Sequence, residues 1–270
     1  QSMRETLRAW TETVETFVLE VIQGERRGKL AAVSRFLLLI LSKVFQLAVK
    51  IRRLLYDWRI IRDYTLGVQV IAIGNLTVGG TGKTPVVEKF ARELKNEGRE
   101  VAILSRGYRS KPAPLHRRLW NKLLLREDRT PPRVVSDGKS LLLDSETAGD
   151  EPYMLASNLK DVIVLVDKDR VKAGRYAIEK FGCDTLLLDD GFQYWRLAGR
   201  RRDILLIDGQ EPFGNERLLP RGTLREHPSH MGRASTIFIT KSDGNSAVLR
   251  SRIARYNAKA GIIERVHDPL

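Results

Sequence analysis

The sequence predicts an α/β fold in which helices flank a mostly parallel β-sheet. Short apolar runs, among them residues 70–73, 101–104 and 162–166, alternate with amphipathic helical segments along the chain. Such alternation is typical of parallel sheets, because each crossover between parallel strands needs a long connection. Two runs end in residues suited to phosphate chemistry: a glycine-dense turn follows residue 73, and two aspartates follow residue 188. The sequence therefore predicts a site at the carboxyl edge of the sheet.

The composition fits a globular protein with an anionic partner. Hydrophobic residues make up 42% of the 270 residues and charged residues 30%, which is ordinary for a folded protein. The formal net charge of +14 indicates a nucleic acid, a phosphorylated substrate or an acidic membrane as the partner. The single cysteine, Cys183, excludes an internal disulfide, so a reducing compartment fits. We expect residues 1–66 to form an N-terminal helical, membrane-associated segment and residues 67–270 to form the α/β core.

The sequence predicts two helices in the N-terminal part of the chain, and they differ in apolar content. Residues 3–21 predict the first, with apolar side chains at helical spacing: Leu7, Trp10, Val14 and Phe17. Residues 24–28 interrupt the pattern. The second helix is predicted over residues 29–62, which are the most apolar stretch of the chain. Polar side chains recur there at steps of three and four residues: Lys43, Gln46, Lys50 and Arg53.

The second helix fits the membrane interface better than the bilayer interior. Lys43 near its centre would cost about 2.5–3.5 kcal/mol inside the bilayer, whereas each leucine or isoleucine returns only about 0.3–0.6 kcal/mol. At the interface the apolar face enters the acyl boundary, and each cation contributes about 1 kcal/mol at an anionic surface. Tyr56 and Trp58 belong to residue types enriched at interfaces. The alternative is a helix packed on the protein's own core; a secretory signal is disfavoured because no small-residue cleavage site follows.

Residues 70–94 carry the strand, loop and helix of a phosphate-binding loop (P-loop). Glycines let the backbone wrap closely around phosphates, and the N-terminus of the following helix presents free N–H groups to them. Lys83 would reach the β- and γ-phosphates, and the Thr84 hydroxyl would hold Mg²⁺. Thr77 stands where the usual pattern has its first glycine. The expected nucleotide-binding residues are Thr77, Val78, Gly79, Gly80, Thr81, Gly82, Lys83 and Thr84.

The elements after the P-loop continue the α/β alternation. Residues 111–132 are basic and proline-punctuated, which predicts a surface insertion with a short helical piece at 119–125. Residues 133–143 predict a β-hairpin around an Asp-Gly pair. One helix is expected to begin near Pro152, and another at residues 171–181. The remaining strands are predicted at 162–166, 185–189, 203–208 and 235–240.

An apolar strand that ends in acidic residues is the second phosphate-chemistry signal. Asp189 and Asp190 follow residues 185–188, and P-loop enzymes use such acids to hold Mg²⁺ or to orient water. Together with the P-loop, these acids favour an enzyme that acts on nucleotide phosphates.

Three classes of P-loop protein come into question: a kinase acting on a lipid-associated substrate, a regulatory GTPase and a nucleic-acid-binding ATPase. Residues 240–243, Thr-Lys-Ser-Asp, are similar to the box that reads guanine. However, Leu188 stands where the Asp-x-x-Gly element of a GTPase needs its aspartate. The cations lack an aromatic stacking platform, which disfavours a nucleic-acid partner.

Five motifs follow one another along the chain: residues 74–85 (GNLTVGGTGKTP), 105–108 (SRGY), 148–152 (AGDEP), 189–193 (DDGFQ) and 219–226 (LPRGTLRE). Together they resemble the tetraacyldisaccharide 4'-kinases, a family of lipid A biosynthesis in Gram-negative bacteria, over residues 68–243. The resemblance implies transfer of the ATP γ-phosphate to the 4'-hydroxyl of a tetraacylated glucosamine disaccharide 1-phosphate. A P-loop GTPase with a regulatory or metallochaperone-like role stays the alternative.

The resemblance implies roles for single residues, with ATP and Mg²⁺ as cofactors. Asp150 resembles the family's proton acceptor for the attacking sugar hydroxyl, and Lys83 serves the nucleotide. Arg225 and Arg170 would offset charge on the phosphates during transfer. The implied Mg²⁺ ligands are Thr84, Asp189, Asp190 and Glu226.

The resemblance further implies a peripheral protein at the cytoplasmic face of the bacterial inner membrane. Its partners would be the lipid-anchored disaccharide and the anionic membrane surface. Neither nucleic acid nor an obligate protein partner is implied.

Three features depart from the family pattern. Tyr194 follows Phe192 and Gln193 where the family commonly has histidine. The segment before the hydrophobic helix is longer than usual for the family. The chain ends at Leu270, ahead of the smaller C-terminal portion that contributes to the family's substrate cleft.

Overall fold

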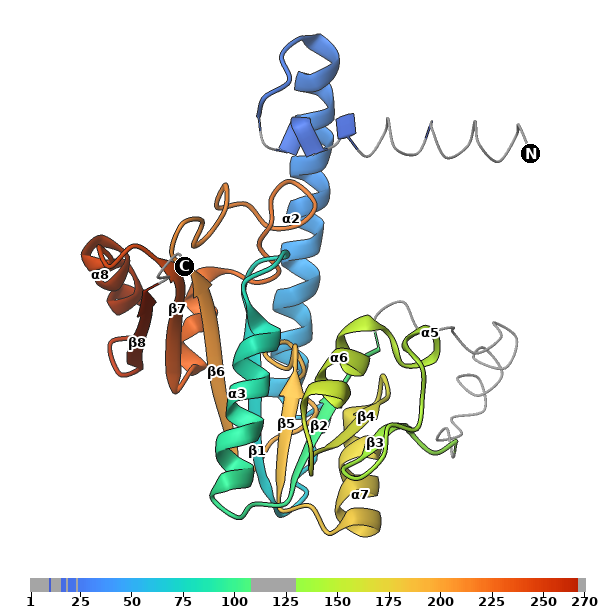
Figure 1. Cartoon of the computed structure of the whole chain (residues 1–270). Coiled ribbons are helices and arrows are strands. Elements are labelled where there is room, and N and C mark those ends of the chain that lie inside the picture. Colours follow the sequence, from blue (N-terminus) through green and yellow to red (C-terminus); the bar gives the residue numbers. More distant parts are fainter. Residues whose placement is uncertain (1–9, 11–15, 18, 23, 108–129, 267–270) are drawn as a thin grey trace.

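An eight-stranded sheet forms the centre of the computed structural model, which describes residues 10, 16–17, 19–22, 24–107 and 130–266. The strand order is β3-β4-β2-β5-β1-β6-β7-β8 (Figure 1). The strands are β1 (Gln69–Asn75), β2 (Val101–Ser105), β3 (Arg133–Asp137), β4 (Ile163–Val166), β5 (Thr185–Asp189), β6 (Arg201–Asp208), β7 (Thr236–Ser242) and β8 (Gly261–Val266). Neighbouring strands are parallel except for β3, which pairs antiparallel with β4. The predicted mostly parallel sheet is confirmed.

The central position of β1 places the P-loop at a switch point of the sheet. β1 pairs with β5 on one side and with β6 on the other, and the chain continues from β1 to β2 on the β5 side. In open parallel sheets, ligands bind at the carboxyl ends of the strands where the strand order reverses in this way. The segment after β1, residues 76–82, lies at that point.

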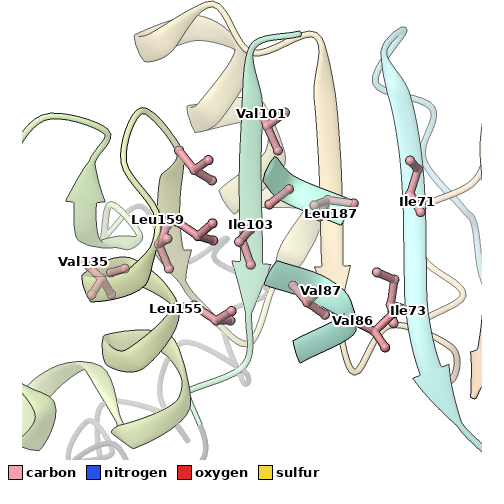
Figure 2. Packing of buried hydrophobic residues seen from close by; sticks show 14 of the residues in the cluster. Ile71, Ile73, Val86, Val87, Val101, Ile103, Val135, Leu155, Leu159 and Leu187 are labelled. Carbon is pink, nitrogen blue, oxygen red and sulfur yellow. The ribbon is translucent and has the colours of Figure 1, made fainter. Parts of the chain in front are cut away.

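Helices cover both faces of the sheet, because alternate residues of each strand point to opposite faces. The helices are α2 (Lys29–Asp57), α3 (Lys83–Asn96), α5 (Ser145–Ala148), α6 (Asp150–Asn158), α7 (Arg170–Phe181), α8 (Ala247–Tyr256) and the 3₁₀ helix η1 (Pro228–Arg233). α3 and α6 pack on one face, where Val86 and Val87 meet Ile71, Ile73 and Ile103 (Figure 2). The intervening residues, Val70 and Ala72, pack instead in the cluster of α7.

A third apolar cluster lies beyond β6 and carries elements absent from the sequence-based expectation. Leu205 and Ile237 of the strands pack there with Leu249 and Ile253 of α8. The strand β8 and the helices α8 and η1 were not predicted. In the predicted hairpin, Leu142 N donates to Val135 O at 2.8 Å, so the chain does reverse around Asp-Gly, but the ladder partner of β3 is β4.

The loop after β5 crosses close to β1. A Cβ on Gly74 would lie 2.7 Å from the Phe192 Cβ and 2.9 Å from the Phe192 nitrogen, which is closer than side-chain atoms approach. Gly191 N donates to Ile73 O at 2.9 Å and ties the same loop to the strand. Glycine at position 74 therefore brings the Asp189–Asp190 segment next to the P-loop.

Helix α2 is 29 residues long and extends well beyond the sheet (Figure 1). It is long and apolar enough to cross a membrane by length and composition, and only 6% of its most apolar window is buried. Phe36, Val44 and Leu47 are 62%, 60% and 58% exposed. Hence the alternative of a helix packed on the protein's own core is wrong for most of its length.

Two further predicted features lie largely outside the described residues. Of the predicted helix at 3–21, the structure shows residues 10, 16–17 and 19–21 as helical, whereas Leu7 and Val14 are outside the description. Of the predicted insertion at 111–132, including its helical piece, only residues 130–132 are described.

Candidate active site

The P-loop is held in place by hydrogen bonds from both sides. Asn75, the last residue of β1, donates through Nδ2 to Thr81 Oγ1 at 2.9 Å, and Lys83 Nζ donates to Asn75 Oδ1 at 3.4 Å. Thr240 Oγ1 donates to Thr81 O at 3.1 Å. Gly82 precedes α3 with a φ of 72°, a left-handed conformation that glycine adopts without strain. The predicted order of strand, glycine loop and helix is present.

Asp189 is a buried carboxylate at the end of β5. Its Oδ2 accepts a hydrogen bond from Ser105 Oγ at 3.2 Å, and the residue is 4% exposed. Burial, together with the nearby carboxylates of Glu151 and Asp190, raises the pKa of Asp189 to about 6. A buried carboxylate with too little positive charge around it is a group that a bound cation would stabilise.

Asp190 stands between two cations. Both of its carboxylate oxygens accept from Arg225 Nη1 at 2.7 Å, and Lys83 Nζ lies 3.8 Å from Oδ1. Its backbone φ of 51° turns the chain sharply after the strand. The structure thus brings together the acid that follows β5, one cation from α3 and one cation from the 219–226 motif.

Arg170 is a buried cation with few hydrogen bonds. It is 5% exposed, its Nη1 donates to Lys168 O at 3.5 Å, and its buried Nε has no hydrogen-bond partner among the described residues. Its guanidinium lies 4.7 Å from the centre of the Tyr194 ring. Burial lowers the pKa of Arg170. A buried guanidinium with free donors is suited to an anionic ligand.

Glu226 belongs to a buried network. Its Oε2 lies 2.6 Å from His230 Nδ1 and accepts from Arg233 Nη1 at 2.9 Å, and its Oε1 accepts from Arg233 Nη2 at 3.2 Å. Burial opposes its charge, but His230 and Arg233 prevail and lower the pKa of Glu226. Both oxygens are thus occupied by protein donors. A positioning role for Glu226 fits this geometry better than direct Mg²⁺ ligation.

A cleft of about 700 Å³ joins these groups. Its wall includes Lys83, Arg170, Asp189, Asp190, Arg225 and Glu226, and also Gly79 of the P-loop. Helix α2 contributes Phe45, Val49 and Arg52 to the same wall. The predicted site residues from four distant segments therefore share one cavity, and the exposed apolar helix forms one side of it.

Neither Asp150 nor Thr84 is among the residues that line the cleft. Asp150 is exposed and is the first residue of α6. Its neighbour in sequence, Glu151, does line the cleft. Thr84 is half-buried in the first turn of α3, directly after Lys83.

Sequence reasoning missed several residues of the cleft wall. Glu151 follows Asp150 within the AGDEP motif, and Arg106 lies within the SRGY motif, so their motifs could have indicated them. Arg52 and Trp195 carry no signal in the sequence, because only the packing of α2 on the loop after β5 brings them together. Trp195 lies in edge-to-face contact with Tyr56, with ring centres 5.6 Å apart.

The acids present fit a magnesium ion. Mg²⁺ is usually bound in proteins through one or two carboxylates together with substrate phosphates and water. Asp189 provides a carboxylate with a raised pKa, Asp190 is adjacent, and the Thr84 hydroxyl is close in sequence to Lys83. Among the described residues, no cluster of three or more histidine, cysteine or acidic side chains could hold a metal by itself, so the phosphates would have to complete the site.

Comparison with known proteins assigns the family. The sequence profile of the family described as LpxK, tetraacyldisaccharide-1-P 4'-kinase, matches residues 34–265. The chain belongs to the tetraacyldisaccharide 4'-kinase family. The family resemblance of the five motifs is thereby confirmed, and the GTPase alternative is not favoured; Leu188, where a GTPase needs aspartate, is buried in the core.

Individual members of the tetraacyldisaccharide 4'-kinase family are also similar to this chain in sequence and structure. The chain is 37% identical over 255 residues to the enzyme of Halothermothrix orenii, covering 93% of this chain and 62% of that protein. It is 42% identical over 219 residues to that of Anaeromyxobacter dehalogenans, covering 81% and 53%. The crystal structure of the "apo" form of LpxK from Aquifex aeolicus in complex with ATP matches with a TM-score of 0.68 and 33% identity, covering 85% of this chain and 64% of that one. The chain thus spans about half to two thirds of these relatives.

Proposed function

We propose that this chain carries the nucleotide-binding and phosphoryl-transfer site of a tetraacyldisaccharide 4'-kinase. The site would transfer the γ-phosphate of ATP to the 4'-hydroxyl of a tetraacylated glucosamine disaccharide 1-phosphate. One observation carries the proposal: Lys83, Asp190 and Arg225 converge in a cleft that is walled on one side by α2. Cations and acids face the expected phosphates, and an apolar helix faces the expected acyl chains.

Charge neutralisation is the main task of the site, because phosphoryl transfer requires positioning and charge stabilisation more than covalent chemistry. The P-loop backbone and Lys83 would hold the β- and γ-phosphates. Arg225 and Arg170 approach the cleft from different segments and would offset the charge that develops on the transferred group. The Asp190–Arg225 ion pair keeps the guanidinium in place before nucleotide binds.

Mg²⁺ would be held by Asp189 and Asp190, with Thr84 from the P-loop helix. When bound, the ion would reduce the negative charge of the phosphates. Glu226, which lines the cleft and which the sequence placed among the metal ligands, would instead hold the side chains of His230 and Arg233 in place.

Asp150 is the proposed proton acceptor for the sugar hydroxyl. It lies at the start of α6, one residue before Glu151, which lines the cleft. A positioned base contributes about 10²- to 10⁴-fold to such a reaction. The neighbouring Glu151 offers an internal control, because Asp150→Asn and Glu151→Gln remove the same charge from adjacent positions.

Helix α2 would dock the protein on the cytoplasmic face of the inner membrane. Its exposed apolar side chains would enter the acyl boundary, and its cations would meet lipid phosphates. Phe45 and Val49 of the same helix line the cleft, so the lipid-anchored disaccharide would reach the P-loop along α2. Residues 1–66 would then be the membrane-associated segment and residues 67–270 the kinase core.

A phosphate-transfer assay tests the proposal. Radiolabelled γ-phosphate from ATP should appear on a lipid A disaccharide precursor. This transfer should proceed without GTP. Lys83→Ala should abolish transfer and leave the unfolding temperature close to wild type, because Lys83 neutralises charge and belongs to none of the three apolar clusters. Transfer at near the wild-type rate by this variant would contradict the P-loop assignment. Tight GTP binding with slow hydrolysis and no lipid phosphorylation would favour a GTPase.

A further inference from the structure

The connection from β5 to β6 passes β1, which lies between these two strands, without forming a helix. Parallel strands are usually joined through a helix, which satisfies its own backbone groups. The crossover segment, residues 190–200, forms neither helix nor strand, yet Gly191, Phe192 and Leu197 in it are buried. Its backbone carbonyls therefore need donors from elsewhere in the protein, because an unpaired buried carbonyl is costly.

Arg201, the first residue of β6, supplies three of these donors. Its guanidinium donates to Gly191 O at 3.0 Å, to Leu197 O at 2.9 Å and to Tyr194 O. The remaining N–H groups, on Nε and Nη2, donate to Asp203 Oδ1 at 3.1 Å and 2.7 Å. All five N–H donors of the guanidinium are therefore used. Such a set of acceptors suits the planar fork of arginine and not the single nitrogen of lysine.

Two of the carbonyls that Arg201 binds belong to residues beside groups of the site. Gly191 directly follows Asp190, the proposed magnesium ligand. The ring of Tyr194 lies 4.7 Å from the guanidinium of Arg170. Arg201 itself does not line the cleft, and its side chain is 10% exposed. One guanidinium outside the cleft thus holds the backbone next to an acid of the site and next to the support of a cation.

We propose that Arg201 is a positioning residue for phosphoryl transfer, which acts through the crossover segment on Asp190. The inference rests on the proposed function, in which Asp190 holds Mg²⁺. Asp190 has a φ of 51°, a backbone conformation that residues other than glycine rarely adopt, so the surrounding structure has to hold it. Arg201 provides this hold at the carbonyl of Gly191. A displacement of about 1 Å in a catalytic arrangement can cost about 10²-fold in rate.

A conservative variant tests the proposal through kinetics. Arg201→Lys keeps a charge opposite Asp203 but places its donors on one nitrogen, so it cannot bind the three carbonyls together. Its kcat should fall about tenfold. The KM for ATP should stay within about twofold, because the P-loop keeps its own hydrogen bonds. Arg202→Lys is the matched control, since Arg202 is next in sequence, exposed and outside the cleft, and it should keep the wild-type kcat.

A second variant covers the case that Arg201→Lys folds poorly. Arg201→Met combined with Asp203→Leu removes both partners of the ion pair, so no buried charge is left unpaired. Its kcat should also fall about tenfold or more. Wild-type kcat in either folded variant would overturn the proposal. Failure of both variants to fold would overturn it too, since Arg201 would then serve folding rather than the placement of Asp190.

A metal-binding measurement separates this proposal from the proposed function. Mn²⁺ is titrated into the full chain in the presence of ADP and followed by electron paramagnetic resonance. Arg201→Lys should bind Mn²⁺ about tenfold more weakly than the wild type, as expected for the loss of a group that orients a metal ligand. Arg202→Lys should bind it like the wild type. In an Asp190→Asn background, Arg201→Lys should add little further loss, because the group that it positions is gone.

This readout needs no phosphate transfer. If the wild type phosphorylates no lipid and Arg201→Lys still weakens Mn²⁺ binding, the proposed function fails and the placement of Asp190 by Arg201 stands. Equal Mn²⁺ affinities of Arg201→Lys and the wild type would overturn the proposal whatever the transfer rate. Additive losses of Mn²⁺ affinity from Arg201→Lys and Asp190→Asn would overturn it as well.

Discussion

The buried carboxylate of Asp189 destabilises the folded protein when it is charged. Its carboxylate is buried, and the pKa rises from the usual 3.8 to about 6 because of burial and two neighbouring acids. Between these values the folded state binds more protons than the unfolded state, so the free energy of unfolding falls as the pH rises through this window. An acid at this position therefore makes the folded protein less stable at neutral pH than a neutral side chain would. The arrangement is understandable when a cation is the intended partner.

Asp189→Asn should therefore stabilise the metal-free protein. In EDTA at pH 7, we expect the free energy of unfolding to rise by up to about 3 kcal/mol, since each pKa unit is worth about 1.4 kcal/mol. At pH 4 the gain should vanish, because the wild-type carboxyl is then protonated. Thermal unfolding at both pH values measures this. A variant less stable than wild type at pH 7 would show that the Ser105 hydrogen bond outweighs the burial of charge.

Tyr194 supports Arg170 in this chain. The ring lies under the guanidinium, and the hydroxyl contacts Asp169 Oδ1 at 3.0 Å, which fixes the ring against the first turn of α7. Burial and the Asp169 charge raise the pKa of Tyr194 to about 12, so it stays neutral at physiological pH and does not itself move protons. Its contribution would be the placement of Arg170.

Tyr194→Leu should lower transfer about tenfold, since a desolvated cation–π contact is worth up to about 2 kcal/mol. Tyr194→Phe keeps the ring and should stay within a few-fold of wild type. In an Arg170→Ala background, Tyr194→Leu should add little further loss, because the partner is already gone. Measured kcat values for the four variants form the test, and additive losses would refute a shared role.

At the scale of elements, α2 is connected to the P-loop through a short series of hydrogen bonds. Arg52 Nη2 donates to Gln193 O at 3.1 Å, Gln193 Nε2 donates to Asn75 O at 2.8 Å, and Lys83 Nζ donates to Asn75 Oδ1 at 3.4 Å. The Arg52 guanidinium also packs on Trp195, 5.2 Å from the ring centre. The exposed apolar helix α2 and the P-loop lysine are thus connected through the same loop after β5.

Arg52→Ala should lower kcat several-fold, because the loop after β5 loses its anchor to α2. Arg53→Ala is the matched control: Arg53 is next in sequence, lies 3.7 Å from Asp57 and does not line the cleft. Both variants lose one cation from α2. Equal losses of kcat in the two would mean that membrane charge, rather than the link to Gln193, is the cause.

For the whole molecule, much of the fold could be predicted because it follows from local patterns. The strands β1, β2, β4 and β5 are short apolar runs whose residues are buried on both faces, so they stand out in the sequence. The cluster of Lys83, Asp189 and Asp190 also followed, since strand ends meet at one edge. β8 was missed because its pattern, Gly-Ile-Ile-Glu-Arg-Val, mixes charged and apolar residues at the edge of the sheet.

Parts of the site that depend on long-range packing could not be predicted. The roles of Arg52 and Trp195 arise only because α2 crosses the loop after β5. The pairing of Glu226 with His230 and Arg233 arises from η1, whose existence has no periodic signal. The roles of single site residues and the boundary at residue 66 stay predictions.

Charge reversal on α2 tests how the whole molecule meets the membrane. Replacing Lys43, Lys50, Arg52 and Arg53 by glutamate should release the protein from anionic vesicles, because about 1 kcal/mol per cation becomes repulsion. High salt should weaken the wild-type interaction only partly, since the apolar face is not screened. Sedimentation with vesicles at moderate salt measures both. Retention of the reversed protein would show that the apolar face suffices alone.

Helix α2 forms a wall of the cleft and is also the proposed membrane-docking helix, and this combination has a kinetic consequence. On the proposed docking, an acceptor reaches the site by lateral diffusion in one leaflet and never crosses bulk water. The relevant substrate concentration is then a density per unit area. Diluting the acceptor with inert lipid at constant total amount should slow turnover, whereas diluting the whole suspension of vesicles with bound enzyme should not. Product would leave by the same two-dimensional route.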